Sequence, residues 1–337
     1  MNTEGFSPEL LLLIATSALL TWAIAWGVQR AAFRLGLVSQ PNARSSHRQP
    51  TPHGGGLGMV LAGTLAGGWL AWSRGVPVLG ETLGLALLLA MVGLRDDFRA
   101  LPVRMRFAVH GAVCTGLLGL LGLLTAPLGM VVLMLLLGIW WINLFNFMDG
   151  IDGLAAAQAL FMLGLGALLA AWGHSERMVQ PLWVMMPCLA AAAAGFLWIN
   201  WPPAKIFMGD VGSTWMAFMI FAMALMSILA GWLEISTWLI LGAGFIADAS
   251  VTLLVRIATG QRWTEAHRSH AYQRLARRWH SHRKVTLLVG AFNLLWLLPL
   301  AGAAQVWPQW GGIGLMLAYA PALAGVTMWG AGKPNDG

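Results

Sequence analysis

Charged residues are scarce in this chain. Only 10% of its 337 residues are Asp, Glu, Lys or Arg, and 58% are hydrophobic. Soluble domains carry about 25% charged residues. Apolar runs of about 20 residues recur from end to end, and each is long enough to cross a bilayer core of about 30 Å. The sequence therefore predicts an all-α fold, a polytopic transmembrane helical bundle, with a single integral membrane domain over 1–337.

Cysteine is also nearly absent. The two cysteines, Cys114 and Cys188, lie inside apolar runs without the spacing of metal ligands, so we interpret them as packing residues. No basic segment precedes the first apolar run, and we expect that run to be a retained span rather than a cleaved signal peptide. The sequence shows neither a repeat nor the matched broken spans that transporters use.

Hydrophobic periodicity and charge together predict a topology. We expect about eleven spans, at 8–29, 55–73, 78–94, 105–125, 128–147, 153–173, 179–199, 212–232, 235–256, 285–304 and 311–331. Of the 20 Lys and Arg residues, only Arg74 and Arg177 follow even-numbered spans. The positive-inside rule then places the N-terminus outside and the C-terminus in the cytoplasm of a bacterial inner membrane. The net charge of +7 serves this topology, so membrane lipid and not nucleic acid is the expected partner.

The acidic residues gather on one predicted face. Asp96 and Asp97 end the third span, Asp149 and Asp152 follow the fifth, and Asp210 follows the seventh, all on the cytoplasmic side. A single Asp at a span end is usually a solvated boundary residue. Carboxylates near the membrane are costly, however, and those that persist are mostly paired or functional. Five of them from three loops predict a metal or phosphate-chemistry site.

Two motifs carry most of this prediction. In the run from 143 to 154, Asn143 and Asn146 lie one helical turn apart, and Asp149 lies one further turn along if the helix continues. The side-chain oxygens of these residues would then share one face, and such oxygens suit Mg²⁺. In the second motif, Gly209 and Asp210 open the eighth span. A helix N-terminus carries partial positive charge and free N–H groups, which favour a carboxylate and neighbouring phosphates.

Basic residues on the same face are candidates for binding a pyrophosphate. The candidates are Arg44, His47, Lys205, His267, Arg268 and His270. A basic loop beside the membrane explains the first two about equally well. A basic interfacial helix that contacts anionic lipid is the alternative for Arg274, Arg277, Arg278, Arg283 and Lys284. Asp248 is interpreted as a buried structural acid, and His110 as a core-packing residue.

Taken together, these motifs resemble those of the polyprenyl-phosphate N-acetylhexosamine-1-phosphate transferases, the MraY/WecA-like glycosyltransferase family 4. The order of the Asp-Asp pair, the Asn-x-x-Asn-x-x-Asp-Gly-x-Asp-Gly run and the Gly-Asp-x-Gly-Ser run carries the resemblance. It implies Mg²⁺, with Mn²⁺ as an alternative, a UDP-N-acetylhexosamine donor, an undecaprenyl phosphate acceptor and release of UMP. It leaves a homodimer open.

The resemblance also implies roles for individual residues. Asp210 and Asn146 match metal-contacting positions, Asp96 and Asp97 match a proposed acceptor-activating pair, and Asp149 and Asp152 match the catalytic acidic run. Substrate-binding roles fall to Asn143, Gly209 and the basic candidates above. The sequence His267-Arg268-Ser269-His270 departs from the three-histidine pattern of the MraY branch and looks more like the O-antigen-initiating, WecA/WbpL-like branch.

Several alternatives stay open at this point. The reaction could be one direct displacement or two steps through a covalent Asp intermediate. The enzyme could be a phospho-N-acetylmuramoyl-pentapeptide transferase of peptidoglycan synthesis, or a glycosyltransferase that releases UDP. Outside enzymes, a lipid transporter would place its acids in a midplane cavity, where only Asp248 fits, and a scaffold protein would show no turnover.

Overall fold

The computed structural model describes residues 8–39, 50–262 and 267–334, and nearly all of them are helical. The first half contains α1 (Pro8–Leu35), α2 (Leu57–Ser73), α3 (Pro77–Phe98), α4 (Val103–Leu120), α5 (Leu128–Met148), α6 (Leu154–Ala171) and α7 (Pro181–Asn200). The second half contains α8 (Asp210–Leu229), α9 (Ile235–Leu241), α10 (Ala243–Ala258), α11 (Ala271–Trp279), α12 (His282–Phe292), α13 (Leu298–Val306) and α14 (Gly311–Met328). Short helical turns are η1 (Leu123–Thr125), η2 (Ser175–Val179), η3 (Asn293–Leu297) and η4 (Pro308–Trp310). Strand in the described residues is limited to the antiparallel pair β1 (Val38–Ser39) and β2 (Thr51–Pro52).

The prediction of an all-α membrane bundle is confirmed. Among the described residues, 8 helices are long and apolar enough to cross a membrane, counting α12 to α13 as one, and α9 with α10 makes a ninth candidate. The 17-residue α2 and the 18-residue α4 coincide with the two remaining predicted spans. The predicted span over 235–256 is not one straight helix, because α9 and α10 meet at Gly242 with a bend of 71°.

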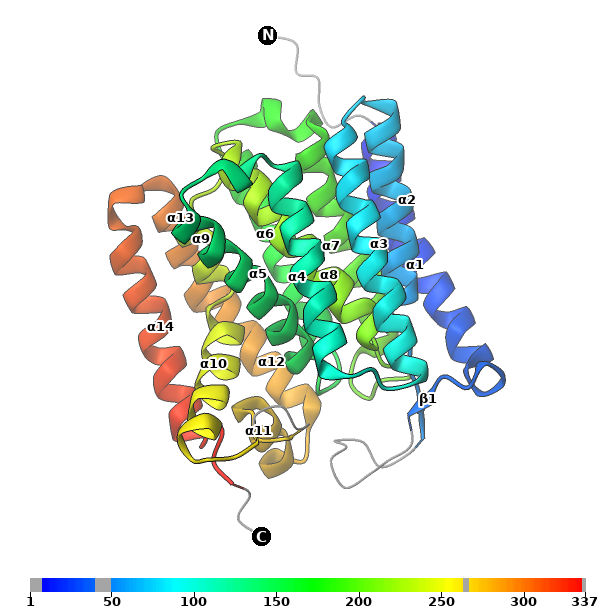
Figure 1. Cartoon of the computed structure of the whole chain (residues 1–337), viewed down its shortest axis with the longest axis vertical. Helices are drawn as coiled ribbons and strands as arrows, with labels where there is room; N and C mark the ends of the chain where they lie inside the picture. Colours follow the sequence, from blue (N-terminus) through cyan, green and yellow to red (C-terminus); the bar gives the residue numbers. More distant parts are fainter. Residues whose placement is uncertain (1–7, 40–49, 263–266, 335–337) are drawn as a thin grey trace.

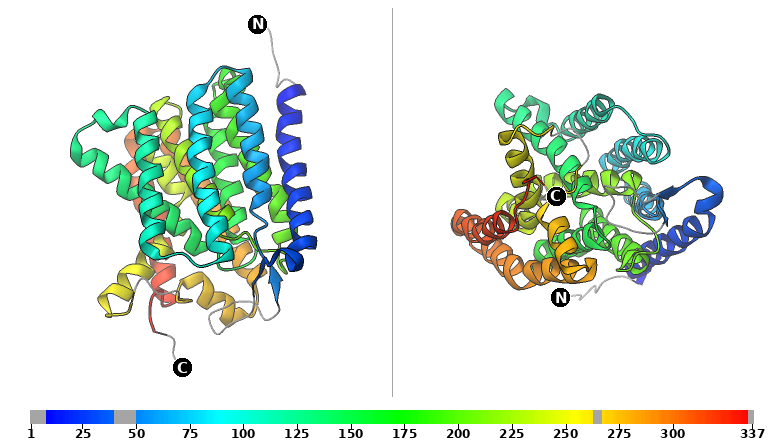
Figure 2. Two further views of the ribbon diagram at one scale, coloured as in Figure 1. Left: turned by 45° about the vertical axis from the view of Figure 1, so that its right-hand side comes forward. Right: turned by 90° about the horizontal axis from the view of Figure 1, so that it is seen from below.

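The helices run side by side, and α8 lies at the centre of the bundle (Figure 1). It packs against α2, α3, α5, α6 and α7. Its Trp215 and Phe218 are fully buried. α1 begins at the upper end and α14 finishes at the lower end, so the described chain crosses the bundle an odd number of times, as predicted. The lower end also holds β1 and α11, which lie below the lower end of α3 and about level with the lower end of α14 (Figures 1 and 2).

Glycine permits the close approaches that position the lower end of α8. A Cβ on Gly56, before α2, would lie 2.3 Å from the Cα of Gly212 in α8. A Cβ on Gly93 in α3 would lie 2.5 Å from the carbonyl oxygen of Asp210. Small residues let helix backbones pack closely where no side chain intervenes. The beginning of α8 is therefore held between α2 and α3 by backbone contact.

Candidate active site

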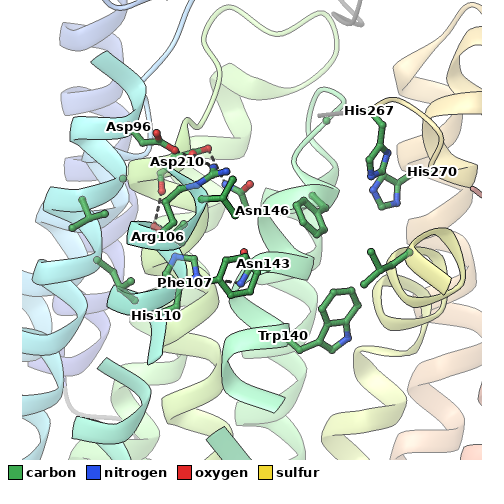
Figure 3. Close-up of a pocket in the computed structure, with 18 of the residues that line it drawn as sticks. Asp96, Arg106, Phe107, His110, Trp140, Asn143, Asn146, Asp210, His267 and His270 are labelled. Carbon is green, nitrogen blue, oxygen red and sulfur yellow. Dashed lines mark hydrogen bonds and ion pairs between the residues drawn. The ribbon is translucent and has the colours of Figure 1, made fainter. Parts of the chain in front are cut away.

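A cavity of about 420 Å³ opens near the lower end of the bundle. Side chains from α3, α4, α5, α8 and α10 line it, together with the segment that leads into α11. Figure 3 shows Asp96, Arg106 and Asp210 on one side of the cavity and His267 and His270 on the other. The predicted third, fifth and seventh loops and the late loop thus come together, as the clustering of acids in the sequence indicated.

Asp210 is the first residue of α8, and its position is set by Asp97. The two carboxylate oxygens of Asp97 accept hydrogen bonds from the backbone N–H groups of Asp210, at 2.8 Å, and Val211, at 3.1 Å. A carboxylate that accepts the first N–H groups of a helix satisfies them and complements the helix dipole. Gly209 has φ +77°, and a Cβ there would lie 2.7 Å from Asp97 Oδ2. Asp97 and Gly209 therefore hold Asp210 in place and do not line the cavity themselves.

Arg106, which the sequence analysis did not select, joins the two carboxylates of the cavity. Its Nη1 lies 3.1 Å from Asp96 Oδ2 and 3.7 Å from Asp210 Oδ2. Asp96 also accepts a hydrogen bond from the backbone N–H of Leu101, which fixes its orientation. The signal in the sequence was an arginine in the first turn of the span that follows the Asp-Asp pair.

The asparagine face of α5 points into the cavity, as predicted from its spacing. Asn146 Nδ2 donates to Asp210 Oδ1 at 2.8 Å and to Ser213 Oγ at 2.9 Å. One turn away, Asn143 Nδ2 donates to the Ile139 carbonyl at 2.7 Å and lies 3.1 Å from His110 Nδ1. The interpretation of His110 as a core-packing residue is incomplete, because this buried side chain also lines the cavity.

His267 and His270 form a stacked pair on the opposite wall. Their ring centroids are 5.0 Å apart, and Phe147 of α5 lies 6.1 Å from the ring of His270. Burial lowers the pKa of His267 to about 3, with smaller contributions from His270 and Arg256. His267 is therefore neutral near pH 7 and serves the cavity as a hydrogen-bonding group.

Asp248 anchors this wall from inside the protein. It is only 3% exposed, and it accepts hydrogen bonds from the backbone N–H groups of Ala271 and Tyr272, both at 2.9 Å. Its Oδ1 also lies 3.3 Å from His270 Nδ1. The prediction of a buried structural acid is confirmed. Asp248 caps α11 and orients His270 toward the cavity.

The remaining two predicted acids lie beside the cavity and not on its wall. Asp152 pairs with His282 Nδ1 at 3.1 Å and accepts the backbone N–H of Ala204 at 3.0 Å, so it holds two loops together. Asp149 follows the last residue of α5. Burial, and then the negative charges of Asp210 and Asp97, hold its pKa well above the ordinary value. This environment therefore favours the neutral form of the Asp149 carboxyl.

The other predicted substrate-binding residues are placed differently. Lys205 is exposed and does not line the cavity. Arg268 lies between the two histidines in sequence, yet its side chain lines a separate cavity. Arg44 and His47 lie outside the described residues. Beside the predicted residues, Phe107 and Trp140 give one part of the cavity an apolar wall (Figure 3).

The donor set of the cavity suits a magnesium ion bound together with substrate. Among the described residues, no three His, Cys, Asp or Glu side chains form a ready-made metal cage. Mg²⁺ sites that act on phosphates use one or two carboxylates and complete their shell with water and phosphate oxygens. Asp96 and Asp210 supply two carboxylates, and Arg106 lies near both of them. Asn146 adds an amide group that donates a hydrogen bond to Asp210. Hard oxygen donors with excess negative charge therefore fit a divalent cation.

The lowered pKa of His267 predicts that acid destabilises the fold. At a pH between 6.5, the ordinary pKa of histidine, and about 3, the pKa in the folded protein, the unfolded chain binds a proton at His267 and the folded chain does not. Stability is therefore lost as the pH falls through this window, and it is unaffected above it. We expect His267→Gln to reduce the fall in melting temperature between pH 7.5 and pH 4.5, measured in detergent. His174→Gln, at an exposed site on the upper end, is the control, and an unchanged slope for His267→Gln would contradict the prediction.

Comparison with known proteins agrees with this geometry. The model of the family described as glycosyl transferase family 4 matches residues 80–228, the segment from α3 to α8 that carries Asp96, Asn146 and Asp210. A protein of Mycolicibacterium smegmatis named decaprenyl-phosphate N-acetylglucosaminephosphotransferase is 31% identical, over 88% of this chain and 82% of its own length. The protein of the same name from Mycobacterium leprae is 30% identical, over 96% of this chain and 87% of its own.

A second group of relatives carries another name. A phospho-N-acetylmuramoyl-pentapeptide-transferase of Rhodococcus jostii is 29% identical, over 74% of this chain and 82% of its own length. Both groups match across most of the helical bundle rather than at one motif. The chain belongs to glycosyl transferase family 4, the polyprenyl-phosphate N-acetylhexosamine-1-phosphate transferases.

Proposed function

We propose that this protein transfers an N-acetylhexosamine-1-phosphate from a UDP-sugar to undecaprenyl phosphate, releases UMP, and so initiates a lipid-linked surface glycan such as O-antigen. The observation that carries the proposal is the Asp96–Arg106–Asp210 cluster beside Asn146, in a cavity with one polar and one apolar part. The names of the relatives favour N-acetylglucosamine as the sugar. The concentration of Lys and Arg in the loops at the same end favours the cytoplasmic face of the inner membrane.

The two substrates are both anionic, so their repulsion has to be offset before they react. Arg106 is the cation of the cavity that lies between the two carboxylates, and it is placed to pair with a phosphate when the acceptor enters. The apolar wall with Phe107 and Trp140 suits the first isoprene units of the lipid. Mg²⁺, held by Asp210 with Asp96 and Asn146 beside it, would supply the positive charge for the donor pyrophosphate.

In the transfer itself, a phosphate oxygen of the lipid attacks the phosphorus that bears the sugar, and the bond from that phosphorus to the UMP oxygen breaks. His267 and His270 face Asp210 across the cavity and donate hydrogen bonds to the donor phosphates (Figure 3). Positioning and charge stabilisation provide most of the rate.

A direct displacement inverts the configuration at phosphorus, whereas two displacements through a covalent Asp retain it. Asp97 is engaged with the N-terminus of α8 through both oxygens, and Asp96 is held by Arg106 and Leu101. These bonds favour the direct route, because a carboxylate that already accepts hydrogen bonds is a weaker nucleophile. A chiral thiophosphate donor tests this assignment, and retention of configuration would contradict it.

The activity itself is tested by nucleotide release from the purified protein in detergent. We expect UMP to appear only when undecaprenyl phosphate, Mg²⁺ and a UDP-N-acetylhexosamine are all present, and to cease when EDTA is added. A panel of UDP-N-acetylglucosamine, UDP-N-acetylgalactosamine and UDP-N-acetylmuramoyl-pentapeptide identifies the donor. Release of UDP would show a glycosyltransferase of the ordinary kind, and release from the pentapeptide donor alone would assign the protein to peptidoglycan synthesis.

A further inference from the structure

A second cavity, of about 470 Å³, lies between α11 and the end of α14. It is separate from the active-site cavity and shares no lining residue with it. Its described lining contains no acidic residue and five cationic ones: Arg268, Arg274, Arg277, Arg278 and Lys333. We call this cavity the basic pocket. Its residues have no part in the proposed transfer, so it requires an explanation of its own.

The walls of the basic pocket are held by specific bonds. Arg274 Nη1 donates to the Lys333 carbonyl at 3.2 Å, and Arg277 Nη1 donates to the Arg268 carbonyl at 2.9 Å. The guanidinium carbon of Arg278 lies 5.4 Å from the centre of the Trp329 ring. A guanidinium has five N–H donors, so Arg274 and Arg278 can each donate to a further acceptor in the pocket. The side chains of Arg274, Arg277 and Arg278 are therefore oriented by contacts with the protein.

The cations of the basic pocket repel one another, and a bound anion lowers that repulsion. Burial, and then the charges of Arg268 and Arg274, lower the pKa of Arg277. The repulsion among like charges falls when a phosphate is bound, since each oxygen can accept two or more charge-assisted hydrogen bonds. The chemistry of the pocket is therefore that of a phosphate-binding site.

The location of the pocket indicates the source of that phosphate. Met328, in the last turn of α14, is 74% exposed, and Trp329 follows it directly. Tryptophan at the end of a span is typical of the headgroup level of a bilayer. Basic pockets between helices on the cytoplasmic side are suited to lipid headgroups. α11 lies about level with the lower end of α14, at the same lower end as the active site (Figures 1 and 2).

We propose that the basic pocket binds the phosphate of an anionic phospholipid headgroup, which links α11 and the end of α14 to the membrane surface. The bond from Gly332 N–H to the Ser269 carbonyl, at 2.8 Å, ties this pocket to the residues between His267 and His270. A bound lipid therefore also steadies the histidine wall of the active site. Arg268, expected from the sequence at the donor phosphates, belongs to this site.

Native mass spectrometry of the full-length protein in detergent tests the proposal without use of the transferase reaction. Phosphatidylglycerol and phosphatidylcholine are titrated as the two lipids. We expect the wild type to bind phosphatidylglycerol more tightly than phosphatidylcholine. In the triple variant Arg274→Gln/Arg277→Gln/Arg278→Gln, the Kd for phosphatidylglycerol is expected to rise about a hundredfold, because each arginine at a membrane surface contributes about a factor of five. The control, Arg34→Gln/Arg283→Gln/Lys284→Gln, removes three exposed charges outside the pocket and is expected to bind like the wild type.

Two other results of this titration would overturn the proposal. Equal affinity of the triple variant and the wild type for phosphatidylglycerol would overturn the proposal. Displacement of the lipid by inorganic phosphate at the same concentration would also overturn it, because the pocket would then be a site for free anions. If the triple variant does not fold, as judged by its melting temperature, Arg278→Gln alone serves. Arg278 is exposed and lies over the face of Trp329, and a several-fold weaker binding is expected.

Discussion

Replacing Asp210 by asparagine is expected to lower kcat for UMP release by about a thousandfold, the scale seen when one preorganised electrostatic group is removed from an active site. The substitution keeps the size of the side chain and removes one negative charge from the cavity. Asp210 Oδ1 accepts from Asn146 and Oδ2 lies 3.7 Å from Arg106, so the carboxylate holds both neighbours in position. The amide introduced by the substitution would face the amide of Asn146, and the site would lose its strongest attraction to a cation.

A binding measurement separates this effect from a general loss of structure. Mn²⁺ is followed by electron paramagnetic resonance in the presence of the donor. We expect the wild type to bind the ion and Asp210→Asn to lose it, with melting temperatures within a few degrees of each other. Glu176→Gln makes the same chemical change at an exposed site on the upper end and leaves both readings unchanged. If Asp210→Asn kept the turnover of the wild type, Asp210 would not be part of the catalytic site.

Replacing Gly93 by alanine is expected to lower kcat/KM by about a hundredfold, because a displacement of about 1 Å at reacting groups has effects of that size. The new Cβ would lie 2.5 Å from the carbonyl oxygen of Asp210, 2.6 Å from its carbonyl carbon and 2.7 Å from Val211 N. These are all backbone atoms, so the methyl group can be accommodated only if α3 and α8 move apart. The hydrogen bonds that Asp97 accepts from the backbone N–H groups at the beginning of α8 lengthen with that movement.

The matched control for Gly93 lies in the same helix. A Cβ on Gly84 meets nothing within 4 Å, and Gly84 is exposed. Alanine is a better helix former than glycine by about 1 kcal/mol, so Gly84→Ala keeps or slightly raises the melting temperature. Gly93→Ala lowers it, since overpacking costs about 1–3 kcal/mol. Similar activity and stability of the two variants would show that α3 and α8 are not held by this contact.

The sequence was sufficient for the fold class and for much of the site. Apolar runs located all eleven predicted segments, because the thickness of a bilayer imposes one length on every span. The segment 235–256 shows the limit of that argument: it is mostly apolar, and hydropathy does not respond to the bend at Gly242. The spacing of Asn143 and Asn146 placed them on one face, since helical periodicity is a local property.

The tertiary structure decided which residues of the same type do which task. Asp96 and Asp97 are adjacent in sequence, yet one lines the cavity and the other caps α8, because successive helical residues point about 100° apart. His267 and Arg268 precede α11 in a segment without regular structure, and they too diverge, toward the active site and the basic pocket. Composition and periodicity thus determined a membrane bundle with its acids at one end. The roles of Arg106, Asp248 and the basic pocket arise from contacts between helices far apart in the chain, which no local pattern records.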